Sequence, residues 1–205
     1  MRIGLVCPYS LTIPGGVQGQ VLGLARSMRA LGHDVRVLAP CDGPPPEPGI
    51  TPLGNSIPTA ANGSVAPLAP DPAAQLRTIR ALNDEQFDVV HVHEPMAPGP
   101  TMTALFVKTA PIVATFHAAG RIDLYDRTRA VLRRLARGID VRCAVSPDAE
   151  SMAKSVIGGD FRLVFNGVEV DRYAKATPTP TVGKTIFFVG RHEPRKGLQV
   201  LLEAM

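Results

Sequence analysis

The spacing of apolar residues switches repeatedly between two patterns along this chain. An apolar run at residues 3–7 is followed by apolar positions three and four apart between residues 17 and 31, and then by a second apolar run from residue 35. Continuous apolar runs are typical of buried strands, and the three-and-four spacing marks one face of a helix. The first forty residues therefore predict a strand–helix–strand unit with a right-handed crossover.

The same alternation continues to residue 165. We predict helices at 72–83, 96–108, 124–137 and 147–157, and strands at 87–92, 112–116, 141–145 and 162–165. Strands that alternate with helices in this way indicate a parallel, doubly wound sheet of the Rossmann-like α/β class. Residues 41–72 are rich in proline, glycine and serine without periodicity, so we expect a long loop there.

The pattern stops at residue 169 and resumes near residue 184. Residues 177–181 alternate threonine with proline, which predicts an extended linker, and a new strand is expected at 185–189 before a helix from about Gly197. We therefore expect a domain at 1–168, a linker at 169–183, and at 184–205 the start of a second Rossmann-like domain that is mostly missing. An isolated strand and half a helix should pack poorly.

Composition narrows the class of protein. The chain has 205 residues and a net charge of +4, which suits an anionic substrate, a phosphate-rich cofactor or an acidic membrane surface. It carries neither a membrane-length apolar run nor a signal peptide pattern, so we expect a cytoplasmic protein. Cys7, Cys41 and Cys143 lack metal-ligand spacing, and we interpret them as buried, inert thiols, with a reactive cysteine as the alternative.

The turn Pro14-Gly15-Gly16-Val17 leads into the first helix. Adjacent glycines let a ligand approach the backbone, and the first N–H groups of a helix favour an anion. A plain glycine-rich connector is an equally good interpretation of the turn alone. The dinucleotide fingerprint G-x-G-x-x-G is absent, which disfavours a nicotinamide or flavin dehydrogenase.

Polar residues follow several other predicted strands, where ligands of open α/β sheets bind. His91 and His93 lie on one side of a strand, and we favour hydrogen-bonded histidines over metal ligands because the sequence indicates no third ligand. His117 opens a small-residue loop, as a polar contact or a proton-transfer group. Arg191 and Lys196 before a helix suit a diphosphate, although a solvated surface turn is the commoner local interpretation.

Taken together and in order, these motifs resemble retaining GT-B glycosyltransferases of the glycogen-synthase-like class. The series comprises Met1-Arg2-Ile3-Gly4, Pro14-Gly15-Gly16-Val17, Leu31-Gly32-His33-Asp34-Val35, Phe87-Asp88-Val89-Val90-His91-Val92-His93-Glu94, Thr115-Phe116-His117, Ser146, Asn166-Gly167-Val168 and Gly190-Arg191 with Lys196-Gly197. Val6-Cys7-Pro8-Tyr9-Ser10, Gly15 to Gln18, and Asn62-Gly63-Ser64 are most similar to the phosphatidyl-myo-inositol mannosyltransferases. The resemblance covers the whole chain but only about half of such an enzyme.

The resemblance implies an acceptor-side domain facing a donor-binding domain across a cleft. By position, Gly15 and Gly16 would bind the donor phosphates, Arg191 and Lys196 would neutralise the leaving diphosphate, and His117 would contact the donor sugar. The acceptor would be an inositol ring held by the residues that match that site: Tyr9, Gln18, Asn62, Gly63 and Ser64. Such enzymes need no metal or cofactor beyond a nucleotide-sugar donor, here GDP-mannose. Nucleic acid is not an expected partner, and the 205-residue chain alone should be inactive.

Some positions depart from the inositol-lipid enzymes and leave alternatives open. Pro67 stands where they carry a basic residue, and the helix that matches their membrane-docking helix offers only Arg77 and Arg80. A soluble sugar or inositol phosphate acceptor with another nucleotide sugar, and a non-catalytic binding module, are therefore the other two hypotheses. The arginine-rich helix at 124–137 is interpreted as solvated, with contact to an anionic membrane at the inner face of the cell membrane as its alternative.

Overall fold

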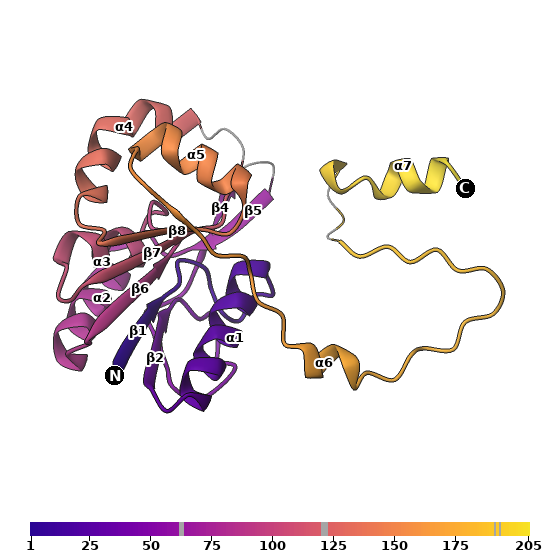
Figure 1. The fold of residues 1–205 in the computed structure, drawn as a ribbon, viewed down its shortest axis with the longest axis horizontal. Coiled ribbons are helices and arrows are strands. Elements are labelled where there is room, and N and C mark those ends of the chain that lie inside the picture. The colour runs from indigo at the N-terminus through magenta and orange to yellow at the C-terminus, as the bar shows by residue number, and fades with distance from the viewer. Residues whose placement is uncertain (62–63, 120–122, 191, 193) are drawn as a thin grey trace.

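A computed structural model of the chain describes residues 1–61, 64–119, 123–190, 192 and 194–205. Its centre is a seven-stranded sheet in the order β3-β2-β1-β6-β7-β8-β9, in which every neighbouring pair is parallel (Figure 1). The strands are β1 (Arg2–Val6), β2 (Asp34–Ala39), β3 (Ile50–Pro52), β6 (Val89–His93), β7 (Ile112–Phe116), β8 (Val141–Ala144) and β9 (Arg162–Leu163). The predicted Rossmann-like α/β class is confirmed.

The helices enclose the sheet in two layers with separate cores. They are α1 (Gly16–Ala30), α2 (Pro72–Glu85), α3 (Pro100–Val107), α4 (Asp123–Ala136) and α5 (Pro147–Ile157). Val21 and Ala25 of α1 pack with Leu5, Val37 and other residues of β1 and β2 in one buried cluster. The second cluster joins residues of β6 and β7, with Val6 of β1 and Leu38 of β2, to residues of α2, α3, α4 and α5, so the two faces of the sheet are covered by different helices.

Alternate residues of β1 and β2 belong to the two different cores. Leu5 belongs to the α1 cluster, whereas its neighbour Val6 belongs to the cluster on the other side. Gly4, which precedes Leu5, must lack a side chain, because a Cβ atom at this position would lie 2.9 Å from the ring of Phe87. The parallel register sets Leu5 beside His91, which places His91 and His93 on the same side of the sheet as Leu5.

The prediction of a long loop at residues 41–72 is wrong in part. Besides β3, this region holds the antiparallel pair β4 (Ile57–Ala61) and β5 (Ser64–Leu68). Its prolines argued against strands in the sequence. Pro58 and Pro67 lie opposite each other in a two-stranded ribbon, where proline is tolerated because the outer edge of each strand has no partner that needs a backbone N–H. The expected turn at residues 62–63 lies outside the described residues.

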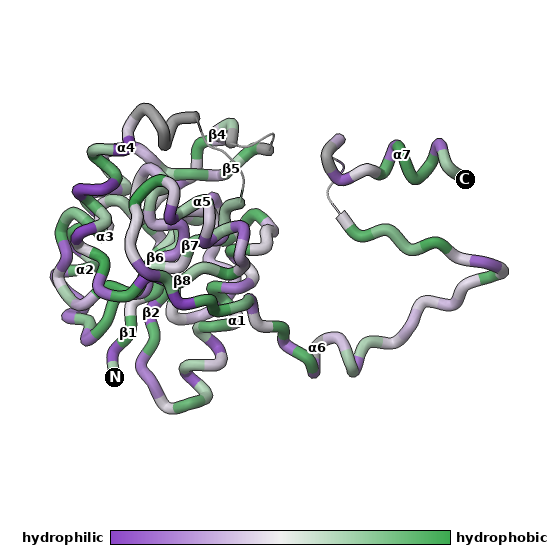
Figure 2. Tube along the Cα trace, turned by 45° about the horizontal axis from the view of Figure 1, so that its top comes forward, coloured by the Kyte–Doolittle hydropathy of each residue, from purple (hydrophilic) through white to green (hydrophobic). Residues whose placement is uncertain are grey.

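The C-terminal segment also differs from expectation. Residues 185–189 are not a strand; they run extended as an apolar stretch (Figure 2) with, in the described chain, no strand beside them to supply ladder hydrogen bonds. A short helix, α6 (Val170–Ala174), interrupts the expected linker, and Asp171 pairs with Lys175 one turn later. Phe187 and Val189 are 85% and 77% exposed, and α7 (Leu198–Glu203) buries no residue, so the expected poor packing is observed.

Candidate functional site

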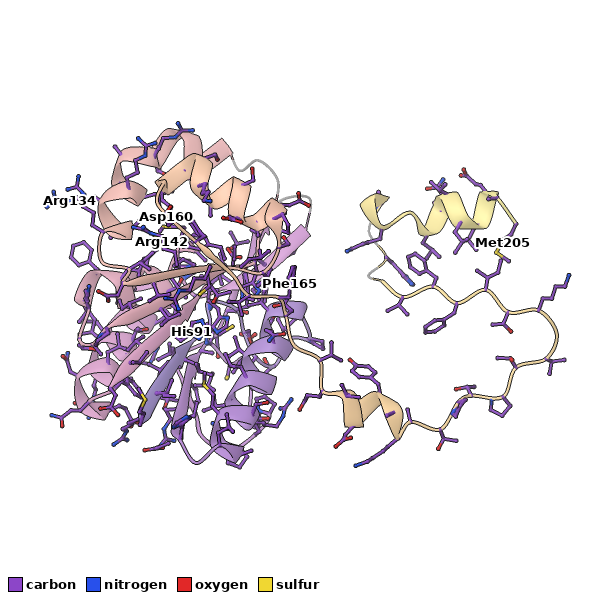
Figure 3. All side chains as sticks on the ribbon, in the orientation of Figure 1. His91, Arg134, Arg142, Asp160, Phe165 and Met205 are labelled. Atoms are coloured by element: carbon purple, nitrogen blue, oxygen red, sulfur yellow. The ribbon has the colours of Figure 1, made fainter. Side chains whose placement is uncertain are left out.

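The carboxyl ends of β1, β6 and β7 lie side by side at one edge of the sheet. These strands are direct neighbours in parallel register, with His93 opposite Thr115. The loops that follow them bring Tyr9, Glu94 and His117 to the same edge, where ligands of open α/β sheets bind. His91 lies in the body of this domain, whereas Met205 marks the separate C-terminal helix (Figure 3).

Three histidines form a connected cluster at this edge. The rings of His91 and His93 stack with centroids 4.3 Å apart, and Nδ1 of His93 lies 3.0 Å from Nε2 of His117. Nε2 of His91 lies 2.7 Å from the hydroxyl oxygen of Thr115. The prediction that the strand histidines are hydrogen-bonded is therefore confirmed.

Burial keeps these histidines uncharged at neutral pH. Desolvation, with a smaller repulsion from His117, lowers the pKa of His91 from 6.5 to about 4. Desolvation likewise lowers the pKa of His117 to about 4, and it holds the pKa of the fully enclosed His93 well below its usual range. Neutral imidazoles hydrogen-bond to one another through one donor and one acceptor nitrogen.

Glu94 holds the loop that carries His117. Its carboxylate oxygen Oε1 accepts the backbone N–H of His117 and, at 2.5 Å, that of Ala118. The side chain is 3% exposed, and burial raises its pKa to about 7 against the lowering effect of these two donors. Its φ of 49° is rare outside glycine, and such conformations concentrate at functional sites. In the sequence, only the position of Glu94 directly after His91-Val92-His93 at a strand end pointed to a role in holding this loop.

The Gly15-Gly16 turn forms the start of α1 without a side-chain cap. Gly15 is the N-cap residue in an extended conformation, no acidic residue occupies the first turn, and a Cβ atom on Gly16 would meet nothing within 4 Å. The first N–H groups of the helix are therefore open to an anion and are not neutralised by a carboxylate.

A groove of about 600 Å³ runs along this turn and the outer side of α1. Gly15, Gly16 and Gln18 contribute to one wall, and Gly167, Glu169 and Tyr173 lie across from them. Glu169 is held in place by both of its carboxylate oxygens, which accept hydrogen bonds from Arg26 of α1 at 2.9 and 2.6 Å. The structure thus brings Gly167 of the Asn166-Gly167 motif to the same groove as the glycine turn, and the volume is within the range of small-molecule sites.

The predicted acceptor residues come from two segments that the structure joins. Tyr9 forms an antiparallel bridge with Leu68, and the backbone N–H of Ser10 donates to the carbonyl of Pro67, so the loop after β1 lies against β5. Ser64 begins β5, while Asn62 and Gly63 lie outside the described residues. Gln18 is buried, and its amide group donates to the carbonyl of Ile13 at 3.1 Å and, more weakly, to that of Ser10.

Of the two predicted diphosphate cations, the structure describes only Lys196, and it does not bring this residue to the site. Arg191 lies outside the described residues, and Lys196 is exposed at the end of the 3-10 turn η1 (Pro194–Lys196). This turn and α7 stand apart from the seven-stranded domain in Figure 1. The structure therefore presents the glycine turn and His117 without Lys196 beside them.

The cysteines are buried and carry no disulfide. Burial raises the pKa of Cys7 to about 12 and also raises the pKa values of Cys41 and Cys143, so the thiolate form is suppressed. The interpretation as inert thiols is confirmed. Among the residues that the structure describes, no group of three or more histidine, cysteine, aspartate or glutamate side chains has the arrangement of a metal site.

Two arginine-bearing helices were candidates for membrane contact. Leu132 of α4 is 3% exposed, and Leu135 packs against the same core, so these two apolar residues of the helix are used inside the domain, whereas Val131 is 57% exposed. Arg133 donates to the carbonyl of Val156 in α5. The solvated-helix interpretation of α4 is therefore favoured. In the described ranges, no helix has both the length and the apolar character needed to cross a membrane.

Comparison with known proteins decides the family. A model of the protein family described as Glycosyltransferase Family 4 matches residues 14–172, which include the glycine turn, the histidine cluster and the start of α6. The chain belongs to this family of glycosyltransferases. The match includes Gly15, Gly16, Gln18, Gly167 and Glu169 of the groove and the loop that Glu94 holds.

Curated relatives are similar over the whole chain. Phosphatidyl-myo-inositol mannosyltransferases from Mycobacterium leprae, Mycobacterium tuberculosis and Mycolicibacterium smegmatis are 47%, 43% and 42% identical to it over its full length. The chain spans only 55–56% of the length of these relatives. The residues that complete a relative of this kind therefore lie outside the matched part.

Solved structures agree on the fold. Anabaena HepE in complex with UDP-glucose superimposes with a TM-score of 0.59 at 17% identity, covering 84% of this chain and 46% of that one. Sucrose-phosphate synthase from Thermosynechococcus elongatus gives a TM-score of 0.55 at 14% identity, with 85% and 52% covered. These glycosyltransferase neighbours have the GT-B arrangement, and the chain matches about one half of it.

Proposed function

We propose that this chain is the acceptor-side part of a retaining glycosyltransferase that moves mannose from GDP-mannose to the inositol ring of a phosphatidyl-myo-inositol lipid. The observation that carries the proposal is the 42–47% identity to mannosyltransferases of that name across every element of the chain. The geometry is consistent with it, because the open helix start and the buried polar cluster follow the carboxyl ends of neighbouring parallel strands.

In the proposed reaction, the open N–H groups at Gly15 and Gly16 bind the donor phosphates. Arg191 and Lys196, supplied from the second domain, neutralise the negative charge that grows on the departing diphosphate. His117 contacts the donor sugar, and the leaving phosphate accepts the proton of the attacking hydroxyl on the same face of the sugar. No metal ion or other cofactor is required in this scheme.

The acceptor is proposed to bind where the loop after β1 lies against β5. Tyr9 and the tip of the β4–β5 ribbon, with Asn62, Gly63 and Ser64, surround the inositol ring. Gln18 acts there through the loop that its amide group holds, since its donors are committed to backbone carbonyls. The lipid tail then points away from the sheet edge.

The outer side of α2 is the proposed membrane-facing surface. Leu76 is 66% exposed, and Arg80, one turn later on the same side of the helix, has an 84% exposed side chain, which forms a surface ion pair with Asp84 at 3.3 Å. An exposed apolar residue beside a cation is typical of helices that lie on an anionic membrane. This placement makes the protein peripheral at the inner face of the cell membrane.

The proposal is tested with a complete chain of family length, GDP-mannose and phosphatidylinositol vesicles. Transfer of mannose to the lipid supports it, and transfer only to soluble inositol phosphate establishes the alternative acceptor that Pro67 favours. Absence of transfer to either acceptor, with intact GDP-mannose binding, identifies a binding module. The 205-residue chain alone should be inactive, because it spans only 55–56% of the length of its relatives and Lys196 stands apart from the groove.

Vesicle co-sedimentation of the complete chain tests whether the outer side of α2 contacts the membrane. Leu76→Ser should reduce binding to anionic vesicles several-fold at low salt. Val131→Ser is the matched control on α4, since Val131 is 57% exposed on the rival helix. Equal loss in both variants, or loss only in the control, contradicts the assignment to α2.

A further inference from the structure

In the hydrogen bond between His93 and His117, either ring nitrogen could carry the shared hydrogen. Nδ1 of His93 and Nε2 of His117 are 3.0 Å apart, so a single hydrogen lies between them. Both rings are neutral, because burial lowers both pKa values. Each ring therefore has one N–H, and the location of the shared hydrogen determines the tautomers of both histidines.

The other nitrogen of His93 decides between the two arrangements. Nε2 of His93 is buried and has no hydrogen-bond partner among the described residues, and the whole side chain is 1% exposed. If this nitrogen carried the hydrogen, a buried donor would be left unpaired, which is rare in proteins; an unpaired acceptor is better tolerated. The hydrogen of His93 therefore belongs on Nδ1, facing His117.

We infer that His93 is a positioning residue that donates its Nδ1 hydrogen to Nε2 of His117 and so holds His117 in the tautomer with its own hydrogen on Nδ1. In the described part of the chain, Nδ1 of His117 has no protein partner and is not among the buried unpaired atoms. His117 thus presents an N–H donor to its ligand. It does not present a basic nitrogen.

The backbone of His117 is positioned independently of its ring. Glu94 accepts the N–H groups of His117 and Ala118, while His93 determines the orientation and tautomer of the imidazole. Two adjacent residues at the end of β6 thereby prepare the donor before any ligand arrives. Such preorganisation reduces the cost of ordering the site in the reaction.

This inference rests on the proposed function for the identity of the ligand. The group that faces Nδ1 of His117 should be an oxygen of the donor sugar, either a hydroxyl or the ring oxygen, acting as hydrogen-bond acceptor. His117 then stabilises the bound sugar and takes no proton from the attacking hydroxyl, and that proton goes to the leaving phosphate as proposed above.

The tautomers are directly measurable by NMR of ¹⁵N-labelled histidine rings in the 205-residue chain at pH 7. The expected spectrum shows His93 and His117 each with hydrogen on Nδ1 and a bare Nε2. A hydrogen on Nε2 of His117 overturns the inference. His33→Gln, far from the cluster at the end of α1, serves as the assignment control.

Two variants of His93 distinguish its role as a hydrogen-bond donor to His117 from a role in packing alone. In His93→Phe the ring volume is kept without a donor, so the Nδ1-hydrogen preference of His117 should weaken. In His93→Asn the amide nitrogen occupies the place of Nδ1, so the preference should return. An unchanged His117 tautomer in both variants contradicts the role assigned to His93.

Activity in a complete chain gives a second readout. His117→Asn keeps a donor at the Nδ1 position and should retain about tenfold more kcat than His117→Gln, which places its amide at the Nε2 position. Equal or reversed activities overturn the inference. If the wild-type enzyme transfers no mannose, the proposed function fails, whereas the NMR result still decides the tautomer.

Discussion

Replacing His91 by glutamine should make the protein less sensitive to acid. The pKa of His91 is lowered from 6.5 to about 4 in the folded chain, mainly by burial. As pH falls, the unfolded chain therefore binds a proton at this residue first, and folding stability is lost between pH 6.5 and about pH 4. The amide of glutamine has no such proton to bind and can still reach the hydroxyl of Thr115, which lies 2.7 Å from Nε2.

The magnitude follows from the two pKa values. Between pH 7 and pH 5 the unfolded chain binds one proton at His91 and the folded chain does not, which lowers the free energy of unfolding by about 2 kcal/mol. His93, His117 and Glu94 also titrate with shifted pKa values, but they are present in both proteins. Their contributions therefore cancel when the wild-type chain is compared with His91→Gln.

Urea unfolding followed by far-ultraviolet circular dichroism at pH 7, 6 and 5 measures the difference. The variant should gain about 2 kcal/mol relative to the wild-type chain on going from pH 7 to pH 5. Thr115→Val is the control, because it removes the partner of His91 but keeps the buried imidazole; it should cost about 1 kcal/mol at every pH. Parallel pH profiles for the wild-type chain and His91→Gln would refute the reasoning.

Three further substitutions test individual positions. Gly4→Ala should destabilise the fold by about 1–3 kcal/mol in urea unfolding, because its Cβ would lie 2.9 Å from the Phe87 ring. Gly16→Ala has open space and should fold normally, yet in a complete enzyme it should weaken GDP-mannose binding measured by calorimetry; unchanged affinity would remove Gly16 from the phosphate site. Ser146→Ala should cost about 1 kcal/mol of stability, since the serine caps α5 by accepting the N–H of Ala149 at 3.1 Å.

Much of the sheet was predictable because its strands are buried on both faces. Such strands have continuous apolar runs, and the predicted strand at 112–116 and helix at 147–157 match the observed bounds. The helix carries its own local signals, a serine cap followed by proline. Local sequence and tertiary packing agree at these positions.

The failures occurred where the structure depends on partners distant in sequence. The strands β4 and β5 are stabilised by each other and by the loop at Tyr9, which no local pattern reveals. The apolar stretch at 185–189 has strand-like composition but no neighbour to pair with in the described chain. Apolar composition predicts a strand only when a second strand is available beside it.

The sequence predicted which residues form the candidate site, but it did not predict the hydrogen bonds between them. His91, His93 and His117 stood out at strand ends, and the parallel sheet predicts that such ends meet. The contact of Glu94 with two backbone N–H groups depends on a backbone φ of 49° that the sequence does not encode visibly. The tautomer of His117 depends in turn on which buried nitrogen lacks a partner.

The uncapped start of α1 has a consequence for measuring ligand binding. Gly15 contributes no side-chain cap and the first turn contains no acid, so the amide hydrogens of Gly16, Val17 and Gln18 have no capping acceptor of their own. These amides should exchange rapidly with solvent deuterium in the free protein and slowly once an anion occupies the turn. The first turn of this helix is therefore a built-in reporter of phosphate occupancy, readable by hydrogen exchange without any label on the ligand.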